Sequence, residues 1–167
     1  MISDKLLVME IVVVLQNIRS LHNVGSVFRT ADAAGVNKLY LCGITPTPVN
    51  KLGHPEPKLA KAALGAEKYI PWEKHRSPAI LIKKLKSLGY RIYAVEQDKK
   101  STSYTKIKPS KNAKIALVLG NEVKGLPKNL LALADKILEI PMHGKKESLN
   151  VSVAFGIVVF QLINAKT

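Results

Sequence analysis

The chain has 167 residues, 47% of them hydrophobic, so it can bury one sizeable core but is short for two ordinary domains, and we expect a single domain over residues 1–167. Lysine and arginine exceed aspartate and glutamate by 26 − 12 = 14, and a balance this basic indicates a polyanionic partner, nucleic acid above all. A single cysteine, Cys42, excludes an intramolecular disulfide, and four scattered histidines give no metal-ligand spacing, so we expect no metal and a reducing, cytoplasmic location.

Strand-like runs alternate with helical patterns along the chain. The first apolar run, residues 6–15, is interrupted by Glu10 and lacks a cleavage site of small residues, so it predicts neither a signal peptide nor a membrane span. Such alternation is typical of an α/β fold with a mainly parallel sheet flanked by helices, in which ligands bind at the carboxyl ends of strands. Strands are expected at residues 10–16, 38–42, 90–96, 114–119 and 136–140, and helices at 24–34, 78–88, 127–134 and 149–163.

The carboxyl ends of the predicted strands direct the search for a site to three loops. The first, residues 16–30, runs from a buried strand into a helix that Asn23 is expected to cap. The apolar spacing of this helix places Arg29 on the face opposite the core, near Ser26 and Thr30, where it can meet a ligand. An ordinary surface arginine is the simpler interpretation of Arg29 alone, because charged residues are mostly exposed.

The second and third loops carry glycines and polar residues beside apolar segments. Residues 119–127, Leu-Gly-Asn-Glu-Val-Lys-Gly-Leu-Pro, have two glycines that permit tight turns and close approach of a flat ligand, yet they match neither a phosphate-binding loop nor a dinucleotide motif. Residues 140–150 lead into the apolar helix, and Ser148 and Asn150 stand directly before it, where backbone N–H groups can bind a ligand. A solvated turn at 119–127 and a capping role for Ser148 are the simpler interpretations.

Taken together, the three loops resemble one known family. Residues 23–30 (Asn-Val-Gly-Ser-Val-Phe-Arg-Thr), residues 119–126, and residues 140–152 with Ile-Pro-Met and Ser-Leu-Asn-Val-Ser look like motifs 1, 2 and 3 of the SpoU (TrmH-like) RNA ribose 2′-O-methyltransferases of the SPOUT superfamily. The motifs have the residues, order and separation of that family, and the resemblance covers almost the whole chain from about Glu10 onward. Residues 61–67 are also similar to the family's stretch between motifs 1 and 2.

The resemblance implies transfer of a methyl group from S-adenosyl-L-methionine to a ribose 2′-hydroxyl of RNA, in a SPOUT fold whose C-terminal part threads a trefoil knot. The knot rests wholly on the family, because known folds are almost always unknotted. The resemblance also implies a homodimer formed through the C-terminal helix, which would explain why residues 149–163 lack a polar face. The cofactor contacts that it implies, mostly through backbone groups, fall at Glu96, Leu119, Gly120, Asn121, Ile140, Met142, Ser148 and Leu149.

The same resemblance suggests catalytic roles. The reaction requires the attacking oxygen to be aligned with the methyl group, its proton to leave and developing charge to be stabilised. By resemblance Arg29 lies nearest the hydroxyl. Because a guanidinium stays protonated in proteins, we expect it to bind the attacking oxygen or an adjacent phosphate rather than act as a base. Glu122 and Asn23 are expected to orient the guanidinium and the ribose, and Ser148 and Asn150 to complete the pocket.

Two alternatives to ribose methylation remain at this stage. One is a noncatalytic RNA-binding or ribosome-associated module on the same fold, and the other is a base-directed RNA methyltransferase. The intact motif residues argue against the first, and the Asn-x-Gly-x-x-x-Arg motif favours the ribose-directed branch over the second. Because the catalytic domain takes up almost the whole chain, the resemblance favours tRNA over rRNA as the substrate. Residues 99–114, with six lysines and no acidic residue, are expected to form an exposed loop that follows an RNA backbone.

Overall fold

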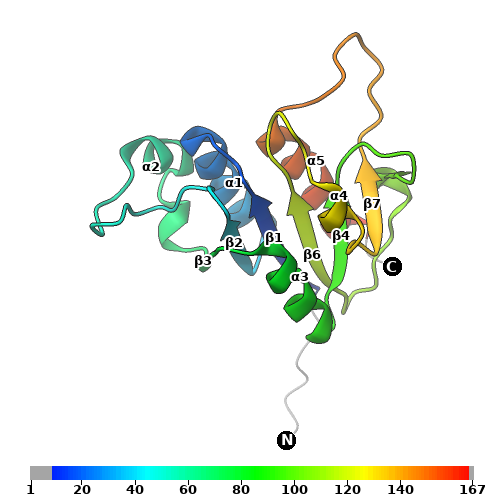
Figure 1. The fold of residues 1–167 in the computed structure, drawn as a ribbon, viewed down its shortest axis with the longest axis horizontal. Coiled ribbons are helices and arrows are strands. Elements are labelled where there is room, and N and C mark those ends of the chain that lie inside the picture. Colours follow the sequence, from blue (N-terminus) through cyan, green and yellow to red (C-terminus); the bar gives the residue numbers. More distant parts are fainter. Residues whose placement is uncertain (1–8, 166–167) are drawn as a thin grey trace, which may run out of the picture.

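The structure, a computed structural model, describes residues 9–165 and has one parallel sheet at its centre (Figure 1). Within these residues seven strands follow the order β3-β2-β1-β6-β4-β7-β5, and each pair of neighbours is parallel. The strands are β1 Glu10–Gln16, β2 Lys38–Cys42, β3 Trp72–His75, β4 Arg91–Val95, β5 Thr102–Ser103, β6 Lys114–Leu119 and β7 Lys136–Glu139. The predicted α/β fold with a mainly parallel sheet is confirmed.

Helices cover both faces of the sheet, as the strand sequences require. Alternate residues of a strand point to opposite faces, and β1 is apolar on both: Ile11, Val13 and Leu15 join one core cluster, Val12 and Val14 the other. The first cluster includes side chains of α1 Leu21–Ala34, α2 Pro57–Ala63 and α5 Val151–Asn164. The second includes side chains of α3 Pro78–Ser87 and α4 Lys128–Leu131. No helix among the described residues combines the length and the apolar character needed to cross a membrane.

Most predicted elements are present, and the omissions share a physical cause. The strands predicted at 10–16, 38–42 and 114–119 have those bounds, and the other two predicted strands are slightly shorter than expected. The edge strand β3 was missed because its side chains are exposed or half-buried, which leaves no apolar pattern to detect. The seven-residue α2 and the two-residue β5 were also missed. The prediction of an exposed loop at 99–114 was wrong in part, because this stretch contains β5 and buries Ile107.

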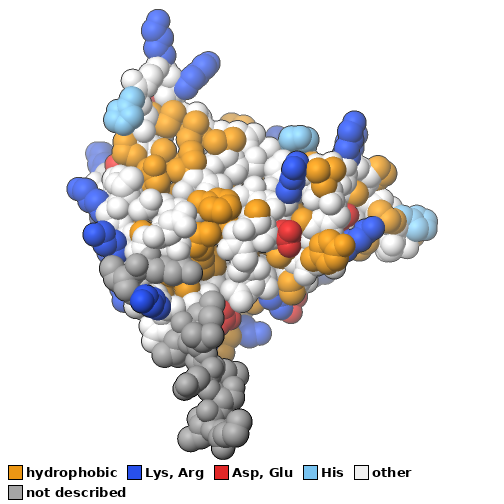
Figure 2. Space-filling view, turned by 180° about the vertical axis from the view of Figure 1, so that it is seen from behind, with side chains coloured by type: hydrophobic (Ala, Val, Ile, Leu, Met, Phe, Trp, Pro, Cys, Tyr) orange, Lys and Arg blue, Asp and Glu red, His pale blue; other side chains and the backbone are white. Residues whose placement is uncertain are grey.

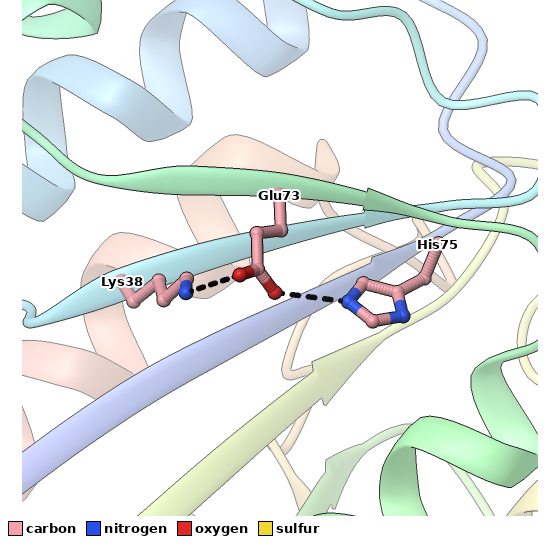
Figure 3. A network of polar contacts seen from close by, with 3 residues as sticks. All are labelled: Lys38, Glu73 and His75. Carbon is pink, nitrogen blue, oxygen red and sulfur yellow. Dashed lines mark hydrogen bonds and ion pairs between the residues drawn. The ribbon is translucent and has the colours of Figure 1, made fainter.

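The edge strand β3 is attached to β2 by polar contacts on its surface (Figure 3). The Glu73 carboxylate contacts Lys38 Nζ at 2.8 Å through one oxygen and His75 Nε2 at 3.1 Å through the other. These two hydrogen bonds hold the pKa of Glu73 below its usual value. Charged side chains on an edge strand discourage pairing with another chain, which fits the position of β3 at the end of the sheet.

Close packing of α2 on α1 accounts for the glycine in the first motif. Gly25 is buried, and a Cβ atom on it would lie 2.4 Å from the backbone oxygen of Leu59 and 2.7 Å from the Cβ of Ala62. Both of those residues belong to α2, which lies beside α1 (Figure 1). Gly25 is therefore a helix-packing residue rather than part of a ligand site.

Candidate functional site

A cavity of about 210 Å³ opens at the carboxyl ends of β4, β6 and β7. Its walls come from three segments: the end of β4 with Glu96 and Gln97, the loop after β6, and the long connection from β7 to α5. The lining is mixed, with apolar side chains such as Leu119 and Leu138 beside polar ones. All the positions that the sequence assigned to a cofactor line this one cavity, namely Glu96, Leu119, Gly120, Asn121, Ile140, Met142, Ser148 and Leu149.

The loop after β6 has a tight form that depends on its glycines. Asn121 and Gly125 make an isolated antiparallel bridge, and Gly125 has a φ of 64°, in the left-handed region that favours glycine. A Cβ atom on Gly120 would lie 2.6 Å from backbone atoms of both Gly125 and Leu126. The Glu96 carboxylate fixes the far end of the loop, since it accepts the Leu126 N–H at 2.9 Å. Glu96 thus lines the cavity and also shapes its neighbouring wall.

Three of the predicted catalytic residues form a chain of hydrogen bonds. Asn150 donates through Nδ2 to Asn23 Oδ1 at 3.0 Å, and Asn23 donates through its own Nδ2 to Glu122 Oε1 at 3.1 Å. The three side chains come from the start of α5, the first turn of α1 and the loop after β6. Asn23 is buried, so its amide is held in this orientation. The fold therefore joins the three motifs at one point beside the cavity.

The Glu122 carboxylate is an acceptor for several N–H groups. Besides Asn23, it accepts the backbone N–H of Arg19 at 3.2 Å and that of Ser20 at 3.3 Å. Burial by itself raises the pKa of Glu122, but the hydrogen bonds from its own backbone and from these neighbours outweigh it, and the pKa lies below its usual value. Glu122 is therefore ionised at neutral pH.

The structure corrects the two predicted helix caps. Ser20, not Asn23, caps α1, because its hydroxyl accepts the Asn23 N–H at 3.2 Å. Asn150, not Ser148, caps α5, because its Oδ1 accepts the Ser152 N–H at 2.9 Å. Both errors have one cause: the apolar pattern marks the part of a helix that packs on the core, and neither helix begins where that pattern begins. Ser148 lines the cavity instead.

Arg29 is exposed on α1, on the side away from the core, as predicted. Its expected contact with Glu122 is absent from the described part of the chain, where Glu122 instead receives hydrogen bonds from Asn23, Arg19 and Ser20. The exposed guanidinium thus has no hydrogen bond or ion pair with residues 9–165. A contact between Arg29 and substrate stays a prediction.

Sequence reasoning missed two polar residues that shape the site. Thr45 is fully buried after β2, where its hydroxyl donates to the Leu15 carbonyl at 2.9 Å and accepts the Ile18 N–H at 3.1 Å. Ser20 caps α1. The available signal was Ser20 directly before Leu21, because serine just before the first apolar residue of a helical run is a common cap. Nothing in the sequence around Thr45 marks its hydroxyl as buried.

We predict that replacement of Glu122 by glutamine lowers the stability of the protein in a pH-dependent way. A carboxylate whose folded-state pKa is lowered stabilises the fold above its unfolded pKa, and this contribution is lost as the pH falls through the folded pKa. The difference in free energy of unfolding between wild type and Glu122→Gln should therefore be largest at pH 7. It should approach zero in acid, below about pH 4. Urea unfolding at pH 7 to 3 and constant ionic strength measures it.

Glu56→Gln is the matched control for that series. Glu56 precedes α2 without capping it through its side chain. It should show a smaller difference from wild type at pH 7. A Glu122→Gln difference that is constant with pH, or that grows in acid, would contradict the role given to the carboxylate.

The three motifs lie within a region that matches a known protein family. The sequence model of the SpoU rRNA methylase family matches residues 10–160, which is most of the chain. The chain belongs to the SpoU family. This confirms the resemblance seen in the three motifs. The tRNA (guanosine(18)-2′-O)-methyltransferase of Aquifex aeolicus is a similar SpoU relative, 33% identical over 156 residues that make up 91% of this chain and 68% of that protein.

Two solved structures of similar sequence share the fold of this chain. An AdoMet-bound rRNA methyltransferase from Sinorhizobium meliloti superposes with a TM-score of 0.81 at 31% identity, over 91% of this chain and 55% of that one. A structure described as giving insight into the 2-OH methylation of C/U34 on tRNA has a TM-score of 0.76 at 30% identity, over 93% of this chain and 94% of that one. The chain therefore spans little more than half of some SpoU relatives and nearly all of others.

Proposed function

We propose that this protein transfers a methyl group from S-adenosyl-L-methionine to the 2′-hydroxyl of a ribose in RNA. The observation that carries the proposal is the meeting of three motif loops: a cavity with all the expected cofactor positions in its lining lies beside the Asn150–Asn23–Glu122 chain. Membership of the SpoU family and the likeness to AdoMet-bound SpoU structures support it.

The cavity suits this cofactor chemically. Apolar side chains at Leu119, Leu138 and Ile140 offer contact to a flat ring and a thioether chain, and Gly120 lets the loop fold back without a side chain in the way. When bound, S-adenosyl-L-methionine supplies an electrophilic methyl group on a sulfonium. The chain's own residues must then place the 2′-oxygen in line with that methyl group.

The side chains have two kinds of role: some fix the positions of the polar groups beside the cavity, and one supplies positive charge. Glu122 holds Asn23, and Asn23 holds Asn150, so the polar groups beside the cavity keep one arrangement. Arg29 supplies a permanent positive charge that stabilises the oxygen as its proton is lost, or binds a neighbouring phosphate. Ser148 lies on the cavity wall and completes the ribose end of the pocket.

Incubation with total RNA and labelled cofactor, followed by mapping of the methylated nucleotide, tests the proposal. We expect the methylated nucleotide in tRNA rather than in rRNA. The preference for tRNA is supported by the similar tRNA (guanosine(18)-2′-O)-methyltransferase and by the structure concerned with 2-OH methylation of C/U34 on tRNA. Nucleoside mass spectrometry separates ribose from base methylation, and calorimetry with S-adenosyl-L-methionine separates an enzyme from a binding module. No methyl incorporation into either RNA from an undermodified source would refute the proposal.

We also propose that the chain forms a single catalytic domain whose C-terminal part threads a trefoil knot. The connection from β7 to α5 shares the cavity walls with the loops after β4 and β6, and Gln97 donates to the Glu147 carbonyl. After β7, near one end of the sheet, the chain continues into α5, which packs against α1. The contact of this connection with the ends of β4 and β6 is what supports the family's knot here.

We also propose a homodimer through α5. Val153 and Phe160 are 49% and 38% exposed, and with the half-buried Ile157 between them they follow the spacing of one helix face. Figure 2 shows hydrophobic side chains gathered on the side of the molecule that α5 occupies. The self-complementary partner expected for such a face is a second copy. Sedimentation should give a dimer for wild type and a monomer for Val153→Glu, whereas a monomeric wild type would contradict the dimer.

RNA binding should depend steeply on salt through the lysines of residues 99–111. Burial of Ile107 and Pro109 holds Lys106 and Lys108 outward, and no ion pair in the described chain neutralises them. Each phosphate contact contributes about 0.7–0.9 to the slope of log K against log salt. We predict that Lys106→Gln with Lys108→Gln lowers the slope of RNA binding by about 1–2.

Lys83→Gln with Lys84→Gln on α3 is the control pair for the salt series. These lysines are also exposed, but they lie on the opposite helical layer. RNA affinity measured by fluorescence anisotropy at several salt concentrations should change less in this pair. Equal losses in the two pairs would show that only the total charge matters.

A further inference from the structure

Asn17 has a backbone conformation that is uncommon for residues other than glycine. It follows the last residue of β1 and has a φ of 54°, in the left-handed region where residues other than glycine are rare. Asparagine is among the residues that tolerate this region best. The conformation turns the chain sharply out of the sheet toward α1, which begins at Leu21. Such a residue persists where the surrounding contacts fix it.

Three contacts fix Asn17, and they come from two other loops. Its backbone N–H donates to the Cys42 carbonyl at 3.2 Å, and its side-chain Oδ1 accepts the Ile44 N–H at 3.0 Å. Its own carbonyl accepts a hydrogen bond from Asn121 Nδ2 at 2.8 Å. A Cβ atom on Gly43 would lie 1.9 Å from Asn17 Oδ1, so the Asn17 side chain occupies space that only a glycine leaves open.

The residues between Asn17 and α1 are held in the same manner. The Ile18 N–H donates to Thr45 Oγ1, and the N–H groups of Arg19 and Ser20 donate to the Glu122 carboxylate. Each of these backbone donors is therefore satisfied by a side chain from the loop after β2 or the loop after β6. Residues 17–20, which lead into α1, are therefore positioned by these two loops.

The loop after β6 thus has two faces with different partners. Asn121 and Glu122 line the cofactor cavity, while their side chains hold Asn17, Arg19 and Ser20. Asn121 also accepts the N–H groups of Val123 and Lys124 through Oδ1, so one amide both shapes the turn and reaches across to Asn17. The same two side chains therefore connect the cavity wall to the start of α1.

We propose that Asn17 is a positioning residue, through which the cofactor-side loop at 120–125 sets the placement of α1 and hence of Asn23 and Arg29. This rests on the proposed methyl transfer and adds a regulation of the same site: occupancy of the cavity orders the entry into α1 before RNA is methylated. Asn17 does not line the cavity, so it acts on the reaction through Asn121 and α1 rather than by touching the cofactor.

Two variants test the connection from its two ends. Asn121→Asp keeps the Oδ1 acceptor for the turn at 121–124 but loses the Nδ2 donor, and it sets a carboxylate against the Asn17 carbonyl. Asn17→Ala loses the side-chain acceptor and favours a different backbone conformation, while Asn17→Gly keeps the left-handed turn if the alanine variant fails to fold. Asn37→Ala is the control, because Asn37 Oδ1 likewise accepts a backbone N–H of β1, from Ile11 at 2.8 Å, at the opposite end of the strand.

The experiment combines single-turnover methyl transfer, calorimetry with S-adenosyl-L-methionine, and amide hydrogen exchange of residues 18–23 with and without that cofactor. We expect Asn121→Asp and Asn17→Ala to lower the rate at least tenfold. In Asn17→Ala, whose changed residue does not line the cavity, the cofactor dissociation constant should stay within threefold of wild type. We also expect the cofactor to slow exchange at 18–23 in wild type and Asn37→Ala but not in these variants. A merely structural role would not remove this cofactor-dependent protection.

The outcomes separate this inference from the proposed function. Rates in Asn17→Ala, or in Asn17→Gly where only that folds, within twofold of Asn37→Ala would overturn the positioning role. Cofactor-dependent protection that persists in Asn121→Asp at saturating cofactor would overturn it too, as would a loss of cofactor affinity in Asn17→Ala that matches its loss of rate. A wild-type protein that binds the cofactor without methylating RNA would refute the proposed function, whereas the exchange comparison needs no turnover and would still decide the role of Asn17.

Discussion

Replacement of Arg29 by alanine should abolish methyl transfer and leave the affinity for S-adenosyl-L-methionine nearly unchanged. Arg29 is exposed on α1 and does not line the cavity, so the cofactor has no contact to lose. The attacking oxygen loses the permanent positive charge that favours its anionic form. Single-turnover transfer to RNA measures the first effect and calorimetry the second.

Arg91→Ala is the control for Arg29→Ala. Arg91 is also exposed, but it begins β4, at the amino ends of the strands, whereas the cavity lies at their carboxyl ends. Its loss should leave the single-turnover rate near that of wild type. If Arg29→Ala retained more than about a tenth of the wild-type rate, a barrier change below ~1.4 kcal/mol, Arg29 would not be central to the reaction.

Replacement of Gly120 by alanine should weaken cofactor binding strongly. The new Cβ atom would lie 2.6 Å from backbone atoms of Gly125 and Leu126, which cannot move aside as a flexible side chain can. The loop must open, at a cost typical of overpacking, about 1–3 kcal/mol. The dissociation constant for S-adenosyl-L-methionine should therefore rise roughly ten- to hundredfold in calorimetry.

Gly144→Ala serves as the comparison for Gly120→Ala. Gly144 lies in the connection from β7 to α5, and a Cβ atom there would meet no heavy atom within 4 Å. It should bind the cofactor almost as wild type does. Equal affinities of the two variants would show that the loop after β6 does not need its closed form for binding.

The elements that the sequence predicted well are those whose burial is visible in composition. Strands β1 and β6 are apolar on both faces, so their bounds were read directly. The edge strand β3 shows no such run, because only one of its sides has a partner strand. The caps failed for a related reason: Ser20 and Asn150 are polar, and their roles depend on where each helix begins.

The site could be predicted only as a set of residues. The motif resemblance selected Asn23, Glu122 and Asn150, but it gave no connection between them. The two hydrogen bonds that join these side chains link positions 99 and 127 apart in the chain. Contacts of that separation depend on strand order, which no local pattern contains. The turn at Asn17 was missed because a left-handed φ cannot be read from the residue type alone.

The packing of Gly25 against α2 affects how the residue at this position should be interpreted in homologous sequences. It stands between Asn23 and Arg29 in the first motif, yet the backbone of α2 is what excludes a side chain there. The motif therefore combines two unrelated physical requirements, one from the proposed chemistry and one from the packing of the helix between β2 and β3. In a homologue whose β2–β3 connection takes another path, alanine or serine at this position would be tolerated and would be no sign of an inactive enzyme.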